Sequence, residues 1–338
     1  MKTYQEIVTF QRNVFDKVAS NCRCHFIPGF SICIDEQLMP LKSRCRFIVY
    51  MPNKPDKFGM KFWLAVDNET KYIYNIMPYL GALEKEARNG MKLADYVVKK
   101  LISPILNKAY NVTCDNYFTS LGLANELSNN KTTMVGTLRV NSKGIPTELK
   151  NEKLDLHASS FYYNAKNAVL LTKYQCKKQK SVFLLSTMHV NPYVDETNKR
   201  KPDLIHFYNK NKCGVDAADS MLRMYSCRCG SRRWPVAVWQ NLLDVAVLNS
   251  WVCYRIATNS KITRKKFLMN LIIQLTSKQE PIDQANNIAT TKRKCSIVMC
   301  KNKSQTTCRT CKKVLCGTHC DNPVEKIFLT VCSSCDNI

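Results

Sequence analysis

Hydrophobic positions follow two different spacings in the first part of this 338-residue chain. In the first 28 residues apolar side chains recur at helical spacing, which predicts one helix over residues 4–28. From about residue 30 to residue 80 they form short runs and alternations instead, which are typical of strands. The strands expected in this region cover residues 31–34, 46–51, 61–66 and 72–77.

Helices and strands alternate in the next part of the chain. The pattern predicts helices over residues 92–107 and 120–127, and strands over residues 110–114 and 133–140. Residues of about 141–205 carry short strand patterns separated by basic turns, and helical spacing returns after them. The later elements expected are strands 161–163, 168–174 and 181–186 and helices 215–224, 235–256 and 264–275. This order predicts an α/β fold with a mixed sheet and helices on its faces.

The charge of the chain indicates the class of its partner. Lys and Arg total 51 against 26 Asp and Glu, which gives a net charge of +25. Such an excess favours a polyanion such as nucleic acid, because each neutralised phosphate releases condensed counterions. With 45% apolar residues the chain can bury a core, which excludes wholesale disorder. No window of 18 uninterrupted apolar residues and no signal-peptide pattern is present, so we expect an intracellular protein and no membrane partner.

Thiols stay reduced inside cells, so the 18 cysteines need an explanation other than disulfides. Eight of them lie between residues 295 and 335, in close pairs whose spacing is typical of zinc ligands. Because sequential pairs often alternate between two metals, we expect two structural Zn²⁺ ions in a cross-brace. One would be bound by Cys295, Cys300, Cys316 and His319, and the other by Cys308, Cys311, Cys332 and Cys335. Cys320 is an alternative to His319, and ring-like protein-interaction modules share this ligand pattern.

Acidic residues stand where a metal could use them. We expect Asp35 and Asp115 each to end an apolar strand, and Asp216 and Asp219 to share one face of a helix. Phosphoryl transfer at DNA uses two Mg²⁺ ions, roughly 3.5–4 Å apart, which activate the attacking oxygen and neutralise the leaving one. Hard cations prefer carboxylate ligands. Acids at such positions are also common as turn formers and N-caps, so the residues alone leave both interpretations open.

Several longer strings resemble the piggyBac transposases. They are Ile34-Asp35-Glu36-Gln37-Leu38, Tyr50-Met51-Pro52-Asn53-Lys54-Pro55, Met77-Pro78-Tyr79-Leu80-Gly81, Thr113-Cys114-Asp115-Asn116-Tyr117-Phe118-Thr119-Ser120, Gly214-Val215-Asp216, Arg233-Trp234-Pro235 and Arg264-Lys265-Lys266-Phe267. They occur in the family's order, and the similarity extends from about residue 4 to the C-terminus. The family usually has a second glycine where this chain has Cys213.

This resemblance implies an RNase H-like catalytic domain in which Asp35, Asp115 and Asp216 bind two Mg²⁺ ions, with Asp35 between both metals and Asp219 as a further functional acid. Such enzymes nick DNA at the transposon end, and the freed 3′-OH attacks the opposite strand to form a hairpin. The hairpin is then reopened and the element is joined at TTAA targets. The implied partners are double-stranded DNA and, in the full-length form, a second copy in a homodimer.

The resemblance also divides the chain into parts. They are residues 1–29 (the remnant of an N-terminal DNA-binding and dimerisation domain), 30–140 with 204–225 (the catalytic domain), 141–203 (a β-rich insertion domain), 226–283 (the second half of the DNA-binding and dimerisation domain), 284–294 (a linker) and 295–338 (the cysteine-rich zinc-binding domain). Because Asp35 lies near Met1, only the last helix of the N-terminal domain is expected. A truncated or domesticated DNA- or chromatin-binding protein without catalytic activity is therefore the alternative, and a zinc-dependent protein-interaction module is a third.

Basic and aromatic residues in two segments are candidates for DNA contacts. Arg232 and Arg233 precede Trp234, whose ring either stacks on bases that leave the duplex or belongs to the core. The others lie around the cysteine-rich tail, which in the family recognises transposon-end DNA. They are Lys292, Arg293, Lys294, Lys312 and Lys313. The run from Lys292 to Lys294 also suits nuclear import, so we expect a nuclear protein.

Overall fold

The computed structural model describes residues 4–81, 88–197, 199–231, 233–277, 293–296, 299–304 and 313–315, with side chains from residue 13 onward. Residues 1–268 form one compact unit and residues 269–338 a second. The first unit carries the sheet and the helices that pack on it, and it contains all four acids singled out in the sequence.

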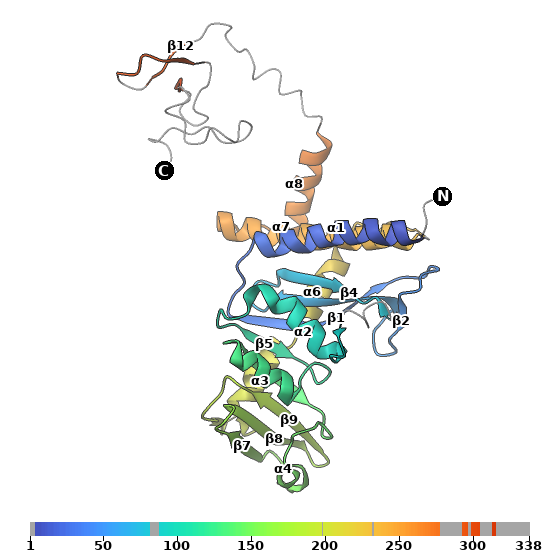
Figure 1. Cartoon of the computed structure of the whole chain (residues 1–338), viewed down its shortest axis with the longest axis vertical. Coiled ribbons are helices and arrows are strands. Elements are labelled where there is room, and N and C mark those ends of the chain that lie inside the picture. Colours follow the sequence, from blue (N-terminus) through green and yellow to red (C-terminus); the bar gives the residue numbers. More distant parts are fainter. Residues whose placement is uncertain are drawn as a thin grey trace. The chain divides into compact units, whose positions relative to one another are not determined.

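A nine-stranded mixed sheet organises the first unit (Figure 1). Its strands are β1 (Ser31–Pro40), β2 (Ile48–Tyr50), β3 (Phe58–Asp67), β4 (Ile73–Pro78), β5 (Asn111–Cys114), β6 (Thr133–Leu138), β7 (Ser159–Asn164), β8 (Val169–Lys177) and β9 (Lys180–Ser186). They are ordered β2-β3-β1-β5-β6-β9-β8-β7, with β4 also paired to β3. Strand β1 is antiparallel to β3 and parallel to β5, and β5 is parallel to β6. The sheet therefore changes direction of pairing at β1.

Helices cover both faces of this sheet. Helix α6 (Gly214–Met224) packs against β1 and β3, where the Cys33 thiol donates to the carbonyl of Lys212 at 3.3 Å. Helix α2 (Leu93–Ile102) packs against β3 and β4, where the Asn75 amide donates to the carbonyl of Leu101 at 2.7 Å. Asn75 of β4 pairs with Ala65 of β3, which pairs with Ile34 of β1, so these three side chains lie on one face of the sheet. Side chains alternate along a strand, so Cys33 lies on the other face, and α2 and α6 therefore cover opposite faces.

The remaining helices of the first unit complete this cover. Helices α1 (Tyr4–Cys24) and α7 (Trp234–Thr258) lie side by side in Figure 1 and contact each other, and α1 also packs on β4. The others are η3 (Ser103–Ile105), α3 (Leu121–Asn129), α4 (Thr147–Asn151) and α5 (Asp203–Asn211), of which α3 packs on β6. Helix α8 (Arg264–Thr276) follows α7.

Helix α7 is long and apolar enough to cross a membrane by length and composition, yet 56% of its apolar window is buried inside the protein. Val245 and Leu248 on this helix are fully buried. The Asn249 side chain both accepts from the backbone N–H of Ile73 and donates to its carbonyl, each at 2.9 Å. These two bonds satisfy the backbone at the outer edge of β4, so α7 completes the sheet of its own chain.

The sequence predicts the mixed α/β architecture correctly but misjudges particular elements. Strand β1 does not end at Asp35: it continues to Pro40, because Leu38 and Met39 are buried and pair with β3. Helix α5 was not expected, since adjacent apolar pairs in Asp203–Asn211 mask its helical spacing. Helix α4 is also an addition to the predicted elements, and the helix predicted over residues 92–107 divides into α2 and the 3₁₀-helix η3.

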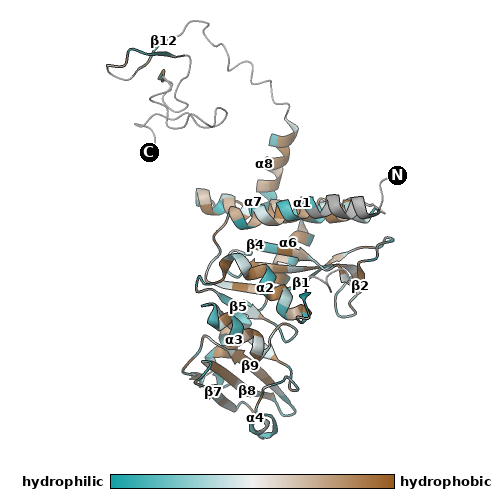
Figure 2. Cartoon of the chain, viewed as in Figure 1, coloured by the Kyte–Doolittle hydropathy of each residue, from teal (hydrophilic) through white to brown (hydrophobic). Residues whose placement is uncertain are grey.

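The basic segment of about 141–203 contributes three strands that continue the main sheet, because β9 pairs with β6. Figure 2 shows the hydrophobic character of β8 and β9, and seven successive residues of β8, Val169–Gln175, are buried. The short strands β10 (Val194–Asp195) and β11 (Lys201–Pro202) form a separate ladder. The domain boundaries drawn from the sequence, including this insertion domain, remain predictions.

Candidate active site

Asp35 and Asp115 lie next to each other where two parallel strands meet. Ile34 of β1 pairs with Cys114 of β5, and the two aspartates are the next residues along each strand. The charge of Asp115 is close enough to help raise the pKa of Asp35. The parallel pairing therefore unites two acids that are far apart in the sequence.

The Asp35 carboxyl is held in an environment that disfavours its charge. Burial, and then the neighbouring Glu36 carboxyl, raise its pKa from 3.8 to about 8, although the backbone N–H of Glu36 donates to Asp35 Oδ1 at 2.8 Å. Glu36 also raises the pKa of Asp115, for which burial is again the largest cause. Uncompensated negative charge on adjacent carboxylates is the arrangement that a divalent cation relieves, so the donor set fits a hard metal ion.

The loop that carries Asp115 is fixed by its own hydrogen bonds. Asp115 Oδ1 accepts from the backbone N–H of Tyr117 at 2.9 Å, and the Asp115 carbonyl accepts from the Thr119 hydroxyl at 2.7 Å. Gly136 of β6 lies directly against this loop, since a Cβ on it would come within 2.1 Å of the Thr119 hydroxyl oxygen. The loop thus holds Asp115 at the end of β5.

Helix α6 brings Asp216 to the face of β1 that carries Asp35. Cys33 and Gln37 lie two residues on either side of Asp35. Cys33 contacts Lys212, two residues before α6, and Gln37 contacts Asp219 of α6, so Asp35 points to the same face. The helix starts hard against β1: a Cβ on Gly214 would lie 2.7 Å from the Cβ of Cys33. Asp216 lies in the first turn of α6, with its side chain 61% exposed.

Asp219 is engaged by other side chains. Its Oδ1 accepts from the Gln37 amide at 2.9 Å, and its Oδ2 from Arg223 Nε at 3.0 Å. Arg223 in turn pairs with Asp56 at 2.5 Å and donates to the Leu38 carbonyl at 3.1 Å. Through these contacts Asp219 helps to hold α6 on β1.

Four partners of the acids were not singled out from the sequence: Glu36, Gln37, Lys54 and Arg223. Lys54 Nζ lies 3.6 Å from Asp216 Oδ1 and donates to the Glu36 carbonyl at 3.3 Å. Three of the four lie inside the strings that carry the family resemblance, which is the signal that could have found them. Arg223 gives only a weaker signal, a basic residue one helical turn after Asp219.

The structure brings Asp35 and Asp115 together, and Asp216 pairs with Lys54. Among the described residues, no group of three or more His, Cys, Asp or Glu side chains is arranged to hold a metal ion. A three-aspartate metal site therefore remains a prediction.

The predicted DNA contacts fall partly outside the described residues. Arg232, Lys292 and Lys312 lie outside them. The Trp234 ring packs edge-on against Phe47 at 5.9 Å, which supports the core interpretation of that ring. The others, Arg233, Arg293, Lys294 and Lys313, are exposed. Contact with DNA remains a prediction for all of them.

Only two of the eight predicted zinc ligands belong to the described residues, Cys295 and Cys300. Cys295 is buried, and its backbone N–H donates to the Asn302 carbonyl at 2.8 Å. Strands β12 (Arg293–Lys294) and β13 (Lys303–Ser304) pair around these cysteines. The other six ligands, Cys308, Cys311, Cys316, His319, Cys332 and Cys335, lie outside the described residues, so the pairing is untested.

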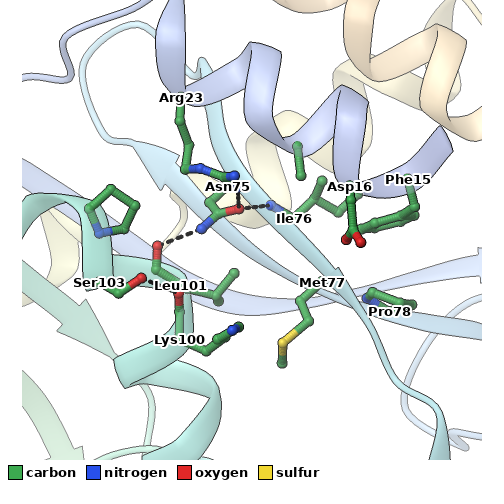
Figure 3. A pocket seen from close by; sticks show the side chains of 12 residues that line it. Phe15, Asp16, Arg23, Asn75, Ile76, Met77, Pro78, Lys100, Leu101 and Ser103 are labelled. Atoms are coloured by element: carbon green, nitrogen blue, oxygen red, sulfur yellow. Dashed lines mark hydrogen bonds between the residues drawn. The ribbon is translucent and has the colours of Figure 1, made fainter. Parts of the chain in front are cut away.

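A surface cleft of about 390 Å³ lies between α1, β4 and the end of α2 (Figure 3). Arg23 donates to the side-chain oxygen Oδ1 of Asn75 at 2.9 Å, and the Asn75 side-chain amide donates to the Leu101 carbonyl, so these polar groups satisfy one another. None of the predicted site residues lines the cleft. We therefore place the candidate active site at the acids and not in this cleft.

Comparison with known proteins defines the class. The family model described as Transposase IS4 matches residues 2–251, most of the chain, so the chain belongs to this family. Human PiggyBac transposable element-derived protein 3 is 21% identical over 331 residues, covering 89% of this chain and 54% of the relative. The human chimeric ERCC6-PGBD3 protein is 21% identical over the same length, which is 30% of that protein. The chain thus spans about half the length of the first of these relatives.

A solved structure points the same way. The cryo-EM structure of a piggyBac transposase synaptic complex with hairpin DNA is 31% identical, with a TM-score of 0.74. The similarity covers 97% of this chain and 74% of that one. Within the transposase family, the chain therefore belongs to the piggyBac transposases.

Proposed function

We propose that this chain carries the catalytic domain of a cut-and-paste DNA transposase that cleaves and joins DNA strands with divalent metal ions. The observation that carries the proposal is the junction of β1 and β5, where Asp35 and Asp115 adjoin on the sheet face that α6 covers. A piggyBac transposase bound to hairpin DNA shares the fold over nearly the whole chain. The sheet with helices on both faces supports an RNase H-like assignment.

Asp35, Asp115 and Asp216 would hold two Mg²⁺ ions, with Asp35 between them. When bound, such ions activate the attacking oxygen and neutralise the leaving oxygen of the phosphodiester. The protein's part is to fix the ligands. Strand pairing fixes Asp35, loop hydrogen bonds fix Asp115, and the close approach of Gly214 to β1 fixes the start of α6. Asp219 would act by positioning α6 through Gln37 and Arg223.

The proposed substrate and partners are those that the family resemblance implies. We propose nicking at transposon ends, hairpin formation and joining at TTAA targets, in a homodimer of the full-length form and in the nucleus. The net charge of +25 supports binding to DNA. Two structural Zn²⁺ ions in residues 295–335 would order the tail, and Arg233, Arg293, Lys294 and Lys313 are exposed candidates for phosphate contacts.

The test is metal-dependent cleavage of DNA. Purified protein is incubated with Mg²⁺ or Mn²⁺ and a supercoiled plasmid that carries the genomic sequences flanking the gene. Nicking should depend on the metal, and Asp35→Ala and Asp115→Ala should each lower the rate by two orders of magnitude or more, on the order expected for loss of a metal ligand. Glu148→Gln, an exposed acid on α4, is the matched control and should leave the rate unchanged.

The second candidate is a piggyBac-derived protein that binds DNA without cutting it. Its support is that one human relative is itself named as a piggyBac transposable element-derived protein. The same experiment separates the two. The non-catalytic protein would be favoured if the chain binds the plasmid but nicks it only at a background rate. That rate would depend neither on the metal nor on Asp115.

A further inference from the structure

Lys54 lies on a turn that holds its own shape. The turn joins β2 to β3, and its backbone is closed by hydrogen bonds from Lys54 N–H to the Met51 carbonyl (3.1 Å) and from Met51 N–H to the Lys57 carbonyl (2.7 Å). Lys57 closes it with a positive φ of 50°. A side chain on such a turn starts from a fixed backbone, so the reach of Lys54 is directed.

The Lys54 ammonium group points into the acidic site. Its Nζ lies 3.6 Å from Asp216 Oδ1 and 3.3 Å from the carbonyl oxygen of Glu36, the residue after Asp35. The Lys54 side chain is only 22% exposed, whereas that of Asp216 is 61% exposed. A mostly buried cation is thus held between the strand of one predicted metal ligand and the helix of another.

A second contact ties the same turn to α6. Asp56 pairs with Arg223 at 2.5 Å, and Arg223 pairs with Asp219 at 3.0 Å. The turn therefore meets α6 with a cation at Asp216 and with an anion at Arg223. This double contact keeps Lys54 beside the acids.

The local charge balance indicates what Lys54 is for. The carboxylates of Glu36, Asp115 and Asp216 repel a DNA phosphate when they are charged. An ion pair with an exposed aspartate stabilises a fold very little. A cation aimed at a developing charge inside a site, in contrast, has a large effect on a transition state.

We propose that Lys54 is a catalytic residue that contacts the scissile phosphate. Lys54 pairs with Asp216 in this structure; were Asp216 to hold a metal ion, the ammonium group would be free to contact a non-bridging phosphate oxygen. In the first cleavage the bond from the attacking water oxygen to phosphorus forms and the bond from phosphorus to O3′ breaks. The attacking water gives up one proton to solvent, O3′ leaves with the electron pair of the broken bond and takes up one proton from solvent, and Lys54 stays protonated throughout. This inference rests on the proposed function.

The test compares the full chain with Lys54→Gln, Lys54→Arg and the matched control Lys57→Gln, which removes the same charge from an exposed position of the same turn. Single-turnover cleavage of the flanking-sequence plasmid is measured at saturating Mg²⁺. Lys54→Gln should be slower by about 100-fold, the loss typical of one transition-state donor. Lys54→Arg should recover most of the rate, and Lys57→Gln should match the unaltered chain. Melting temperatures should be alike in all four proteins.

Mn²⁺ binding without DNA gives a readout that a purely structural lysine would not move. Lys54 competes with metal for Asp216, so Lys54→Gln should bind Mn²⁺ several-fold tighter, while Lys57→Gln should not. Equal effects of Lys54→Gln and Lys57→Gln, or a normal cleavage rate in Lys54→Gln while Asp115→Ala is inactive, would overturn the role of Lys54 alone. An unaltered chain no more active than Asp115→Ala would overturn the proposed function, and this inference with it.

Discussion

The amide of Gln37, on strand β1, donates a 2.9 Å hydrogen bond to Asp219, on helix α6. The same buried side chain exchanges hydrogen bonds of 3.3 and 3.4 Å with Asn241 of α7. One glutamine therefore joins the strand of Asp35 to the helix of Asp216 and to a core helix. Its amide satisfies polar groups that would otherwise be buried without partners.

Replacing Gln37 by Leu should destabilise the protein by about 1–3 kcal/mol, because it leaves the buried Asn241 amide and Oδ1 of the partly buried Asp219 without their partner. Urea unfolding followed by circular dichroism measures this. Gln179→Leu, at an exposed turn position, is the control and should change the free energy of unfolding little. Equal effects of the two substitutions would contradict the proposed connection.

Gly214→Ala should misplace the start of α6. The added Cβ would come within 2.4 Å of Asn68 Oδ1 and 2.7 Å of the Cβ of Cys33, so the helix must shift. We expect a loss of about 1–3 kcal/mol, as for overpacked cores, together with slower cleavage. Gly122→Ala is the control: that glycine lies in α3 with open space around it, so alanine should stabilise by about 0.5–1 kcal/mol. Thermal unfolding of the two variants should therefore shift in opposite directions.

The raised pKa of Asp35 predicts how stability depends on pH without added metal. The folded protein keeps this proton up to a pH of about 8, whereas an unfolded chain loses it near its ordinary pKa of 3.8. Between these values the folded state binds more protons, so the contribution of Asp35 to stability is full below about pH 4 and is lost as the pH rises to about 8.

Asp35→Asn removes this titration. The variant should unfold at higher urea concentration than the unaltered chain at pH 8, and the difference should shrink at pH 5. Asp155→Asn, an exposed acid, is the control and should follow the unaltered chain at both values. If the difference in urea midpoint between Asp35→Asn and the unaltered chain does not vary with pH, the pKa of Asp35 is not raised in the folded protein.

Arg264 should stabilise the end of α6. Its guanidinium is buried, donates to the carbonyl of Met221 and to that of Tyr225 at 3.3 Å, and lies 5.5 Å from the Tyr225 ring centre. Arg264→Met should cost about 1.5–3 kcal/mol, as expected for hydrogen bonds to a charged donor. Lys265→Met removes the adjacent, exposed cation and should be nearly neutral. Differential scanning calorimetry compares them.

Metal analysis tests the cysteine tail. Purified protein should contain about two zinc ions per chain, as a tail with eight ligands implies. Cys300→Ser should lower that number, whereas Cys24→Ser, an exposed cysteine near the end of α1, should not. If purified protein contains no zinc while all its cysteines are reduced thiols, the prediction of two zinc ions in the tail is wrong.

The sequence predicts the strands of the sheet and the positions of Asp35 and Asp115 after apolar strand segments, because these features depend on local pattern. The alternation before Asp115 and the apolar run before Asp35 mark buried strands, and parallel pairing then brings their ends together. The continuation of β1 past Asp35 was missed, because the charged Asp35-Glu36 pair interrupts the apolar run that pairing with β3 extends.

Contacts between distant segments could not be predicted in this way. Lys54 and Asp216 meet only through tertiary packing, and spacing along a chain fixes no distance between such residues. The same holds for Gln37 and Asp219, whose bond depends on how α6 lies across β1. Sequence strings flagged several of these residues without indicating their partners.

Helices α1 and α7 lie side by side although α1 precedes and α7 follows all nine strands of the main sheet. A ribosome therefore releases α1 before these strands and α7 after them. Until then, the backbone at the outer edge of β4, which Asn249 later satisfies, has no cover. Nascent chains that stall before residue 258 should therefore present an open strand edge and apolar surface to chaperones, which makes the late helix the step that commits the newborn protein to its native state.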